Sequence, residues 1–142
     1  MAKPYLIDGL KFDLRVYALI FGVEPLRVFV FKEGLARFAT EEYVGPQKSN
    51  LDNLFMHLTN YAIQKKSDAF VQNEDADDDS GHKRSLTSIL EYMSEHEPGF
   101  SAANMMDKIE DIAVKTAISA SPALAHAYRA CQPDDLENSS CF

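Results

Sequence analysis

Cysteine is scarce in this sequence. The 142 residues contain only Cys131 and Cys141, and both fall in a polar tail. Neither belongs to a CxxC pair, and neither lies near histidines at the spacing of a metal site. The pattern therefore predicts two free thiols and no metal site built from cysteine.

Long apolar runs are also missing. No stretch approaches the roughly 20 residues that a membrane-spanning helix needs. Residues 1–9 lack the basic and apolar regions of a signal peptide. We therefore expect a soluble, cytoplasmic protein without a membrane partner. Its 46% hydrophobic content is sufficient for a modest core in one domain.

Positive charge is in deficit as well. The formal net charge of −8 argues against a nucleic-acid partner, because proteins that bind nucleic acid usually present a basic face to the phosphates. Much of the negative excess is local, since residues 74–79 read EDADDD. The net charge therefore says little about the charge inside any pocket.

A β pattern followed by a helical pattern predicts an α+β fold. Three successive segments are rich in branched and aromatic residues, namely 11–21, 26–31 and 35–40. Turn signals separate them at residues 22–25 and 32–34. We therefore predict an antiparallel β-meander over about residues 11–40, with no internal repeat in the chain.

The composition in the middle of the chain predicts only partial order. Residues 50–60 favour a short helical or irregular segment, and residues 72–82 favour an acidic, mobile loop. The acidic run does not match a calcium-binding EF-hand. Counted from Asp75, its sixth and twelfth positions are Ser80 and Leu86 instead of glycine and glutamate.

Helical periodicity extends over about residues 85–130. One face of a short helix, which must end before Pro98, carries Leu86, Ile89, Leu90 and Met93. Ser101 is placed to cap a longer helix. Its predicted buried stripe is Met105, Ile109, Ile112, Ala113 and Thr116. Pro122 is expected to break or kink this helix, and residues 132–142 are predicted to form a loop-like tail.

The first predicted strand has two distinct faces. With a period of two, Phe12, Leu14, Val16, Ala18 and Ile20 share an apolar face, and Lys11, Asp13, Arg15 and Tyr17 share a polar one. A charged strand face is most often simply turned toward water. Two cations and a carboxylate in register beside a tyrosine also suit a polar ligand groove. Arg37 adds a second guanidinium if it faces the same way.

Four blocks of sequence point to one family. Residues 3–4 read KP, 6–17 read LIDGLKFDLRVY, 33–40 read EGLARFAT and 50–61 read NLDNLFMHLTNY. In this order and at these separations, they resemble the tubulin tyrosine ligase-like family. Residues 125–133, AHAYRACQP, are similar to its polyglutamylase branch. The resemblance covers nearly the whole chain except the acidic insertion and the last residues.

The resemblance implies an internal fragment of an ATP-grasp catalytic domain. In this family ATP phosphorylates a glutamate carboxylate in the tubulin C-terminal tail, and the amine of a free glutamate attacks the acyl phosphate. ATP and Mg²⁺ are the implied cofactors, and tubulin tails, microtubules and free glutamate are the implied partners. The implied location is the cytoskeleton, including the cilium or basal body.

Site residues carry over by position. Lys11 and Asp13 correspond to nucleotide contacts, and Asp13 would accept hydrogen bonds from the ribose. Arg15 would lie against the transferred phosphate, where a guanidinium offers two directed bonds. Arg37 would hold the incoming glutamate or the acyl phosphate. Arg15 and Arg37 are therefore the catalytic candidates that the resemblance implies.

A second group of site residues follows the strands. Thr59 and Asn60 match a nucleotide-binding pair, and Tyr61, Ala62 and Lys83 fall where the branch places groups around the amino-acid substrate. Each also has an ordinary structural interpretation, such as a helix cap at residues 59–60 or a solvated Lys83. The sequence departs from the branch where Ala62 replaces a common serine and Ser85 a frequent lysine.

Other parts of the family's active site are expected outside these residues. They include the purine-binding hinge upstream of Lys3 and the magnesium ligands downstream of Phe142. We therefore expect the chain to be inactive alone. Two alternatives stay open. One is a non-catalytic module that binds acidic tubulin tails in a salt-sensitive way, and the other is a plain α+β interaction domain.

Overall fold

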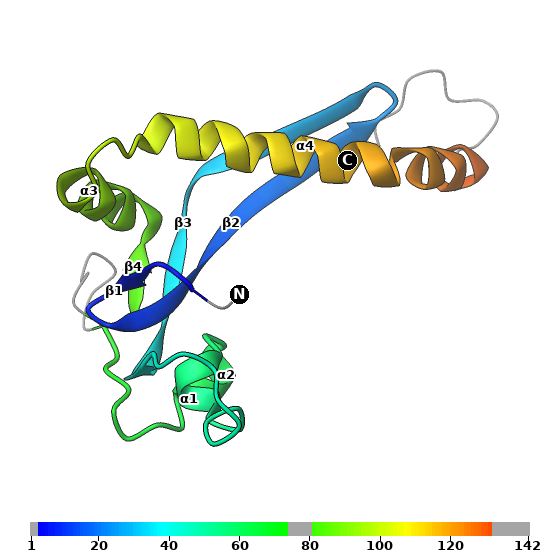
Figure 1. The fold of residues 1–142 in the computed structure, drawn as a ribbon. Helices are drawn as coiled ribbons and strands as arrows, with labels where there is room; N and C mark the ends of the chain where they lie inside the picture. The colour runs from blue at the N-terminus through cyan, green and yellow to red at the C-terminus, as the bar shows by residue number, and fades with distance from the viewer. Residues whose placement is uncertain (1–2, 74–80, 132–142) are drawn as a thin grey trace. The chain divides into compact units, whose positions relative to one another are not determined.

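The computed structural model of the chain describes residues 3–73 and 81–131 (Figure 1). Its elements are β1 (Leu6–Ile7), β2 (Leu10–Val23), β3 (Leu26–Glu42), α1 (Leu54–His57), α2 (Tyr61–Gln64), β4 (Lys83–Ser85), α3 (Leu86–His96) and α4 (Ala102–Cys131). The four strands form one sheet in the order β1-β2-β3-β4. The predicted fold class, an antiparallel sheet followed by helices, is confirmed.

One predicted turn is wrong. β3 runs without a break through residues 32–34, so the predicted second and third strands are one strand. Gly34 marks a close approach between strands instead of a turn. A Cβ atom at this position would lie 2.5 Å from the backbone carbonyl oxygen of Arg15. Glycine therefore lets β3 lie tightly against β2.

Two short strands that the sequence did not predict complete the sheet. β1 pairs with the start of β2 across a tight turn, where Asp8 and Gly9 have φ values of 54° and 74°. β4 pairs antiparallel with β3, and the register sets Lys83 opposite Arg37. The strand β4 thus brings a distant lysine to the charged part of the sheet.

The chain divides into two compact units, and each has its own packing. The first unit comprises Met1–Val16 and Glu33–Gly99. Its core consists of the buried residues Ile7, Ala36, Phe38 and Ile89, with Phe12, Leu14, Tyr92 and Met93 packed against them. Phe12 and Leu14 therefore confirm the first part of the predicted apolar face of β2, whereas Ala18 and Ile20, further along that face, are exposed. Ile89 and Met93 confirm the apolar face of α3.

The carboxylate of Glu33 fastens the start of α3 to β3. It accepts hydrogen bonds from the Thr87 hydroxyl at 2.5 Å and from the Thr87 backbone N–H at 3.2 Å. Ser85 caps the same helix by accepting a hydrogen bond from the Ser88 N–H at 3.0 Å. Two side chains thus satisfy the free N–H groups of the first helical turn.

The second unit comprises Tyr17–Lys32 and Phe100–Phe142. Within it, α4 runs alongside the distal part of the β2–β3 hairpin (Figure 1). The ion pair of Arg129 with Glu24 joins the helix to the hairpin turn, with 2.7 Å between Nε and Oε2. Ser101 accepts a hydrogen bond from the Asn104 N–H at 3.2 Å, which confirms its predicted capping position.

The predicted buried stripe of α4 is only partly correct. Ile112 is 64% exposed and Thr116 is exposed. The less exposed positions recur every four residues, at Met105, Ile109, Ala113, Ala117, Ser121 and Ala125. Residues four apart share one face of a helix, so the stripe passes beside Ile112 instead of through it.

Of the two outcomes expected at Pro122, a break or a kink, the break does not occur, because α4 continues to Cys131. Proline removes one helical hydrogen bond, which leaves the carbonyl of Ile118 without a donor. Both residues are exposed, so water can reach that carbonyl. Despite the length of α4, no helix among residues 3–73 and 81–131 is long and apolar enough to cross a membrane.

Glu33→Gln is predicted to destabilise the chain by about 1 kcal/mol at neutral pH, the usual value of a side chain that caps a helix. Burial works to raise the pKa of Glu33, but hydrogen bonds from Thr87, Gly34 and Leu86 lower it overall. Such a carboxyl stabilises the fold above its unfolded pKa, about 4.3, and loses that effect as the pH falls through the folded value.

Urea denaturation at pH 7 and at successively lower pH tests this prediction. The difference in unfolding free energy between wild type and Glu33→Gln should shrink as the solution is acidified. Glu110→Gln, at an exposed position of α4, is the matched control and should show no such trend. A Glu33→Gln deficit that stays constant down to pH 3 would show that the carboxylate charge is not responsible.

Candidate functional site

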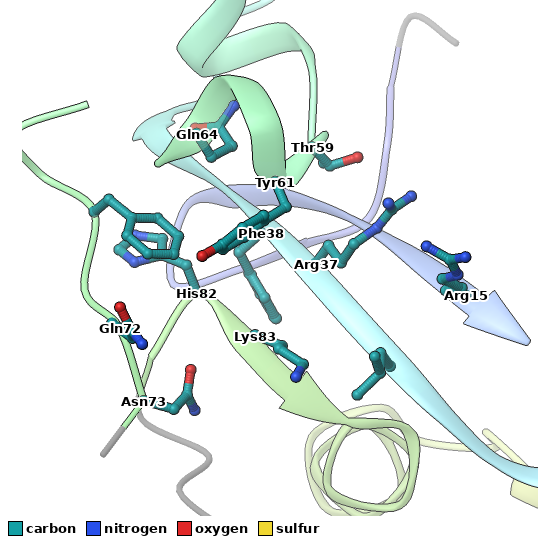
Figure 2. Close-up of a pocket in the computed structure, with 12 residues that line it drawn as sticks. Arg15, Arg37, Phe38, Thr59, Tyr61, Gln64, Gln72, Asn73, His82 and Lys83 are labelled. Atoms are coloured by element: carbon teal, nitrogen blue, oxygen red, sulfur yellow. The ribbon is translucent and has the colours of Figure 1, made fainter. Parts of the chain in front are cut away.

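A pocket of about 520 Å³ opens within the first unit. Its lining includes three cationic side chains, Arg15, Arg37 and Lys83. The other polar or aromatic side chains of the lining are Phe38, Thr59, Tyr61, Gln64, Phe70, Gln72, Asn73 and His82. The pocket therefore collects residues from β2, β3, β4, α2 and the segments beside them (Figure 2).

The charge of the lining has one sign. Arg15 and Arg37 enter from adjacent strands, as Figure 2 shows, and none of the described lining residues is an acid. Lys83 lies directly opposite Arg37 on the antiparallel strand β4, so the two side chains share a face. The positive charge of the lining makes the pocket suited to an anionic ligand.

Asp13 orients Arg37 from the neighbouring strand. The guanidinium donates to both carboxylate oxygens, at 3.0 Å from Nε and 2.5 Å from Nη2. Because the two side chains are 29% and 38% exposed, the pair contributes little to stability. Its two parallel bonds nevertheless fix the plane of the guanidinium. This pair also shows that Asp13 and Arg37 share the polar face of the sheet.

Gln64 holds the connection between α1 and α2 against the edge of β3. Its side chain is almost fully buried, and its Oε1 accepts hydrogen bonds from the backbone N–H and the hydroxyl of Thr40, at 3.0 and 2.7 Å. Its Nε2 donates to the carbonyls of Leu58 and Leu54, at 2.6 and 3.4 Å. The amide thereby places Thr59 and Tyr61 in the pocket.

The structure brings together five of the nine predicted site residues. Arg15, Arg37, Thr59, Tyr61 and Lys83 line the pocket. The other four, Lys11, Asp13, Asn60 and Ala62, are not among its lining residues. Lys11 donates to the carbonyl of His57 at 2.5 Å, and Asn60 caps α2 by accepting from the Ala62 N–H at 3.0 Å. The predicted role of each of the nine stays a prediction.

The sequence did not identify the aromatic wall of the pocket. The ring of Phe70 meets Tyr61 edge-on, with centroids 5.7 Å apart, and stacks on His82 at 5.7 Å and 26°. The Val71 N–H donates to Nδ1 of His82 at 3.0 Å. The available signal was the position of His82, directly before the predicted ligand residue Lys83.

The predicted acidic loop at residues 72–82 has described residues at both ends. Gln72, Asn73 and His82 line the pocket. A Cβ atom at the buried Gly81 would come within 2.5 Å of the side-chain oxygen of Asn73, so the two ends approach closely. Residues 74–80 and the predicted tail at 132–142 lie outside the described residues. Cys131 is a free, exposed cysteine.

No group of three or more histidine, cysteine, aspartate and glutamate side chains within residues 3–73 and 81–131 is arranged to hold a metal ion. The described residues therefore do not form a binding site for the Mg²⁺ that the resemblance implies.

Known proteins match the chain along its length. The model of the "Tubulin-tyrosine ligase family" matches residues 1–142. The chain is 49% identical over 141 residues to the probable beta-tubulin polyglutamylase of Tetrahymena thermophila and 50% identical over 142 residues to tubulin polyglutamylase TTLL6 of Mus musculus. It is 48% identical over 141 residues to tubulin polyglutamylase TTLL13 of Homo sapiens.

These matches cover 99%, 100% and 99% of this chain, respectively. They cover 12%, 16% and 17% of the three relatives. The chain therefore spans less than a fifth of the length of the relatives that it matches.

Gln64→Leu is predicted to destabilise the chain by about 3 kcal/mol or more. Leucine has a similar volume but would leave the Thr40 donors and the Leu58 carbonyl without their partner, and each buried polar group left unpaired costs about 1–3 kcal/mol. Chemical denaturation measures the loss. Gln47→Leu, at an exposed position, is the control and should change stability by less than 0.5 kcal/mol, roughly the limit for surface substitutions. Equal losses in the two variants would refute the bridging role of Gln64.

Proposed function

Since the chain belongs to the tubulin-tyrosine ligase family, we propose that the protein carrying it is an ATP-dependent ligase that adds glutamate to glutamate side chains of tubulin tails. Relatives at 48–50% identity are named tubulin polyglutamylases. The structural observation that carries the proposal is the pocket with Arg15, Arg37 and Lys83 and no described acidic side chain in its lining.

The proposed chemistry requires a site of this charge. A carboxylate oxygen of the tubulin glutamate attacks the γ-phosphorus of ATP, which forms an acyl phosphate and releases ADP. The amine of free glutamate then attacks the acyl carbon, phosphate leaves, and the nitrogen loses a proton as the isopeptide bond forms. Every reactant is anionic, so positioned cations lower the repulsion between them and stabilise charge in the transition state.

We propose different roles for Arg15 and Arg37. Arg15 lies against the transferred phosphate, where its guanidinium donates two directed hydrogen bonds. Arg37 is held in one plane by Asp13 and grips a carboxylate of the incoming glutamate. Lys83, opposite Arg37, adds positive charge beside the same substrate. Tyr61 and Ala62 are the uncharged groups that we place around that substrate.

The other residues that we propose as nucleotide contacts already form hydrogen bonds within the chain. Lys11 already binds the His57 carbonyl, and Asp13 already binds Arg37. Asn60 caps α2 through its side-chain oxygen. In our proposal these three residues and Thr59 orient the ATP-binding side of the pocket, and Asp13 keeps a lone pair for the ribose.

The proposal concerns a protein longer than 142 residues. The chain spans 12% to 17% of the three relatives compared, and their ATP-grasp active site is expected to draw on other segments. We therefore propose that activity requires the full-length protein and that it acts at microtubules, including those of cilia or basal bodies. The experiments below use the full-length protein that carries these residues.

Arg15→Ala is predicted to lower the rate of glutamate incorporation into tubulin tails about a hundredfold, which corresponds to roughly 3 kcal/mol of transition-state stabilisation. Arg15→Lys should recover little of this rate, because an ammonium group cannot reproduce the two-pronged geometry. Radiolabelled glutamate, ATP and tubulin provide the assay, and melting curves check that the variants fold. If folded Arg15 variants incorporate glutamate at the wild-type rate, the catalytic role of Arg15 is wrong and the residue is simply a charge exposed to water.

Arg37→Ala is predicted to raise the KM for glutamate and leave kcat nearly unchanged, because a contact that is equal in ground and transition states affects binding alone. Steady-state kinetics with varied glutamate measure the two parameters. Lys32→Ala, which removes an exposed cation from the same strand, is the control and should change neither. Salt-sensitive binding of tubulin tails without ATP-dependent incorporation by the wild type would instead favour a non-catalytic binding module.

A further inference from the structure

We infer that His82 is a specificity-determining residue of this pocket and that its Nε2–H donates an uncharged hydrogen bond to the side-chain carboxylate of the incoming glutamate. The inference rests on the proposed function, since it names how the same pocket recognises its amino-acid substrate. It is carried by three observations: the tautomer of the ring, the way the ring is held, and the charges that surround it.

The tautomer follows from one hydrogen bond. The Val71 backbone N–H donates to Nδ1 of His82 at 3.0 Å. A ring nitrogen that accepts a hydrogen bond carries no proton, so the single proton of the neutral imidazole lies on Nε2. Protonation of Nδ1 would direct two N–H groups at each other. The geometry of the Val71 contact thus makes Nε2 the donor of the neutral ring.

The ring is held without the use of Nε2. The carbonyl of His82 accepts from the Phe38 N–H at 2.9 Å, its N–H donates to the Val71 carbonyl at 3.4 Å, and its ring stacks on Phe70. Nε2 makes no hydrogen bond to another described residue. The side chain lines the pocket and is half-buried, so Nε2 is the ring atom left for a ligand.

The charges near His82 explain why a neutral donor is useful there. Lys83 and Arg84 follow it in the chain, and Arg15 and Arg37 line the same pocket. Burial lowers the pKa of His82, the Val71 backbone acts in the opposite direction, and the charge of Arg84 lowers the pKa further. The net downward shift keeps the ring neutral at physiological pH. Arginine and lysine attract any anion, whereas a fixed neutral donor stabilises only an acceptor at one position and angle.

The position of His82 selects which carboxylate it would contact. Figure 2 shows His82 with Gln72 and Asn73 on the opposite side of the pocket from Arg15. The transferred phosphate and the reacting groups are proposed to lie at Arg15, so His82 faces a part of the substrate away from the reaction. A free glutamate carries two carboxylates. Arg37 would bind one of them, and His82 would donate its hydrogen bond to the other, the side-chain carboxylate.

Substitutions of His82 in the full-length protein test the inference. His82→Phe keeps an aromatic ring against Phe70 but removes the donor. It should raise the KM for glutamate about tenfold or more, the effect of one lost hydrogen bond to a charged group, and leave the KM for ATP and for tubulin within about twofold. His82→Gln retains a neutral donor and should recover part of the affinity. His126→Phe, at an exposed position of α4, is the control.

A second measurement does not depend on catalysis. Long-range ¹H–¹⁵N correlation spectra of the full-length protein report which imidazole nitrogen carries the proton, and they should show the Nε2–H tautomer for His82. Added glutamate should shift the Nε2 resonance of His82, and the same concentration of norvaline, which lacks the side-chain carboxylate, should not. An Nδ1–H tautomer would overturn the inference, as would equal shifts with both amino acids.

The outcomes separate this inference from the proposed function. If the wild type incorporates glutamate and His82→Phe has the wild-type KM, the inference is wrong and the function stands. If the folded wild type incorporates no glutamate in the presence of ATP, the proposed function is wrong, and the spectra decide whether His82 binds the amino acid. If His82→Phe does not fold, the KM of His82→Gln replaces it, and loss of affinity confined to ATP or tubulin would refute the inference.

Discussion

The buried amide of Gln64 is the interaction on which the geometry of the pocket depends. β4 covers the edge of β3 only as far as Arg37, and the backbone of Thr40 beyond that point would otherwise lack a partner. Gln64 takes the place of a neighbouring strand there and uses its second polar group to hold the carbonyls at the end of α1. A single side chain therefore joins the sheet to the connection that carries Thr59 and Tyr61. The helices α1 and α2 have four residues each, too few to be stable by themselves, so this connection needs such an anchor.

Several charged groups of the sheet make contacts that orient the site, and Arg37 both makes such a contact and lines the pocket. Asp13 forms an ion pair with Arg37, and Lys11 donates a hydrogen bond to the carbonyl of His57 at the end of α1. These contacts orient the neighbouring parts of the site. Arg37 and Lys83 lie opposite each other without an acidic side chain among the described lining residues. The lining therefore carries positive charge, which suits an anionic ligand.

Local patterns predicted the parts of the fold that depend on periodicity. The alternation of Phe12 and Leu14 with Asp13 gave the correct faces for the first part of β2, and the spacing of Leu86 and Ile89 gave the correct face of α3. Gly34 was misread because a glycine after two charged residues has the composition of a turn, whereas its actual role depends on a carbonyl 19 positions away in the sequence. The strand period placed Arg15 on the polar face and Arg37 there only conditionally, whereas Lys83 was placed by resemblance alone. Only the pairing of β4 with β3 shows why a lysine so distant in sequence belongs with the two arginines. Gln64 and His82 were missed for the same reason, since each acts through partners that are remote in sequence or backbone groups that carry no sequence signal.

The close approach at Gly34 has a consequence for how sequence variants of this family member would be interpreted. The atom that a side chain at position 34 would displace is the carbonyl of Arg15, so any replacement of this glycine pushes on the backbone that carries a proposed catalytic guanidinium. A missense variant at position 34 would then resemble an active-site lesion, even though glycine has no side chain to contribute to the chemistry and every polar group of the pocket would still be present. Inherited or engineered changes at this position are therefore better grouped with those at Arg15 than with ordinary surface substitutions on a strand.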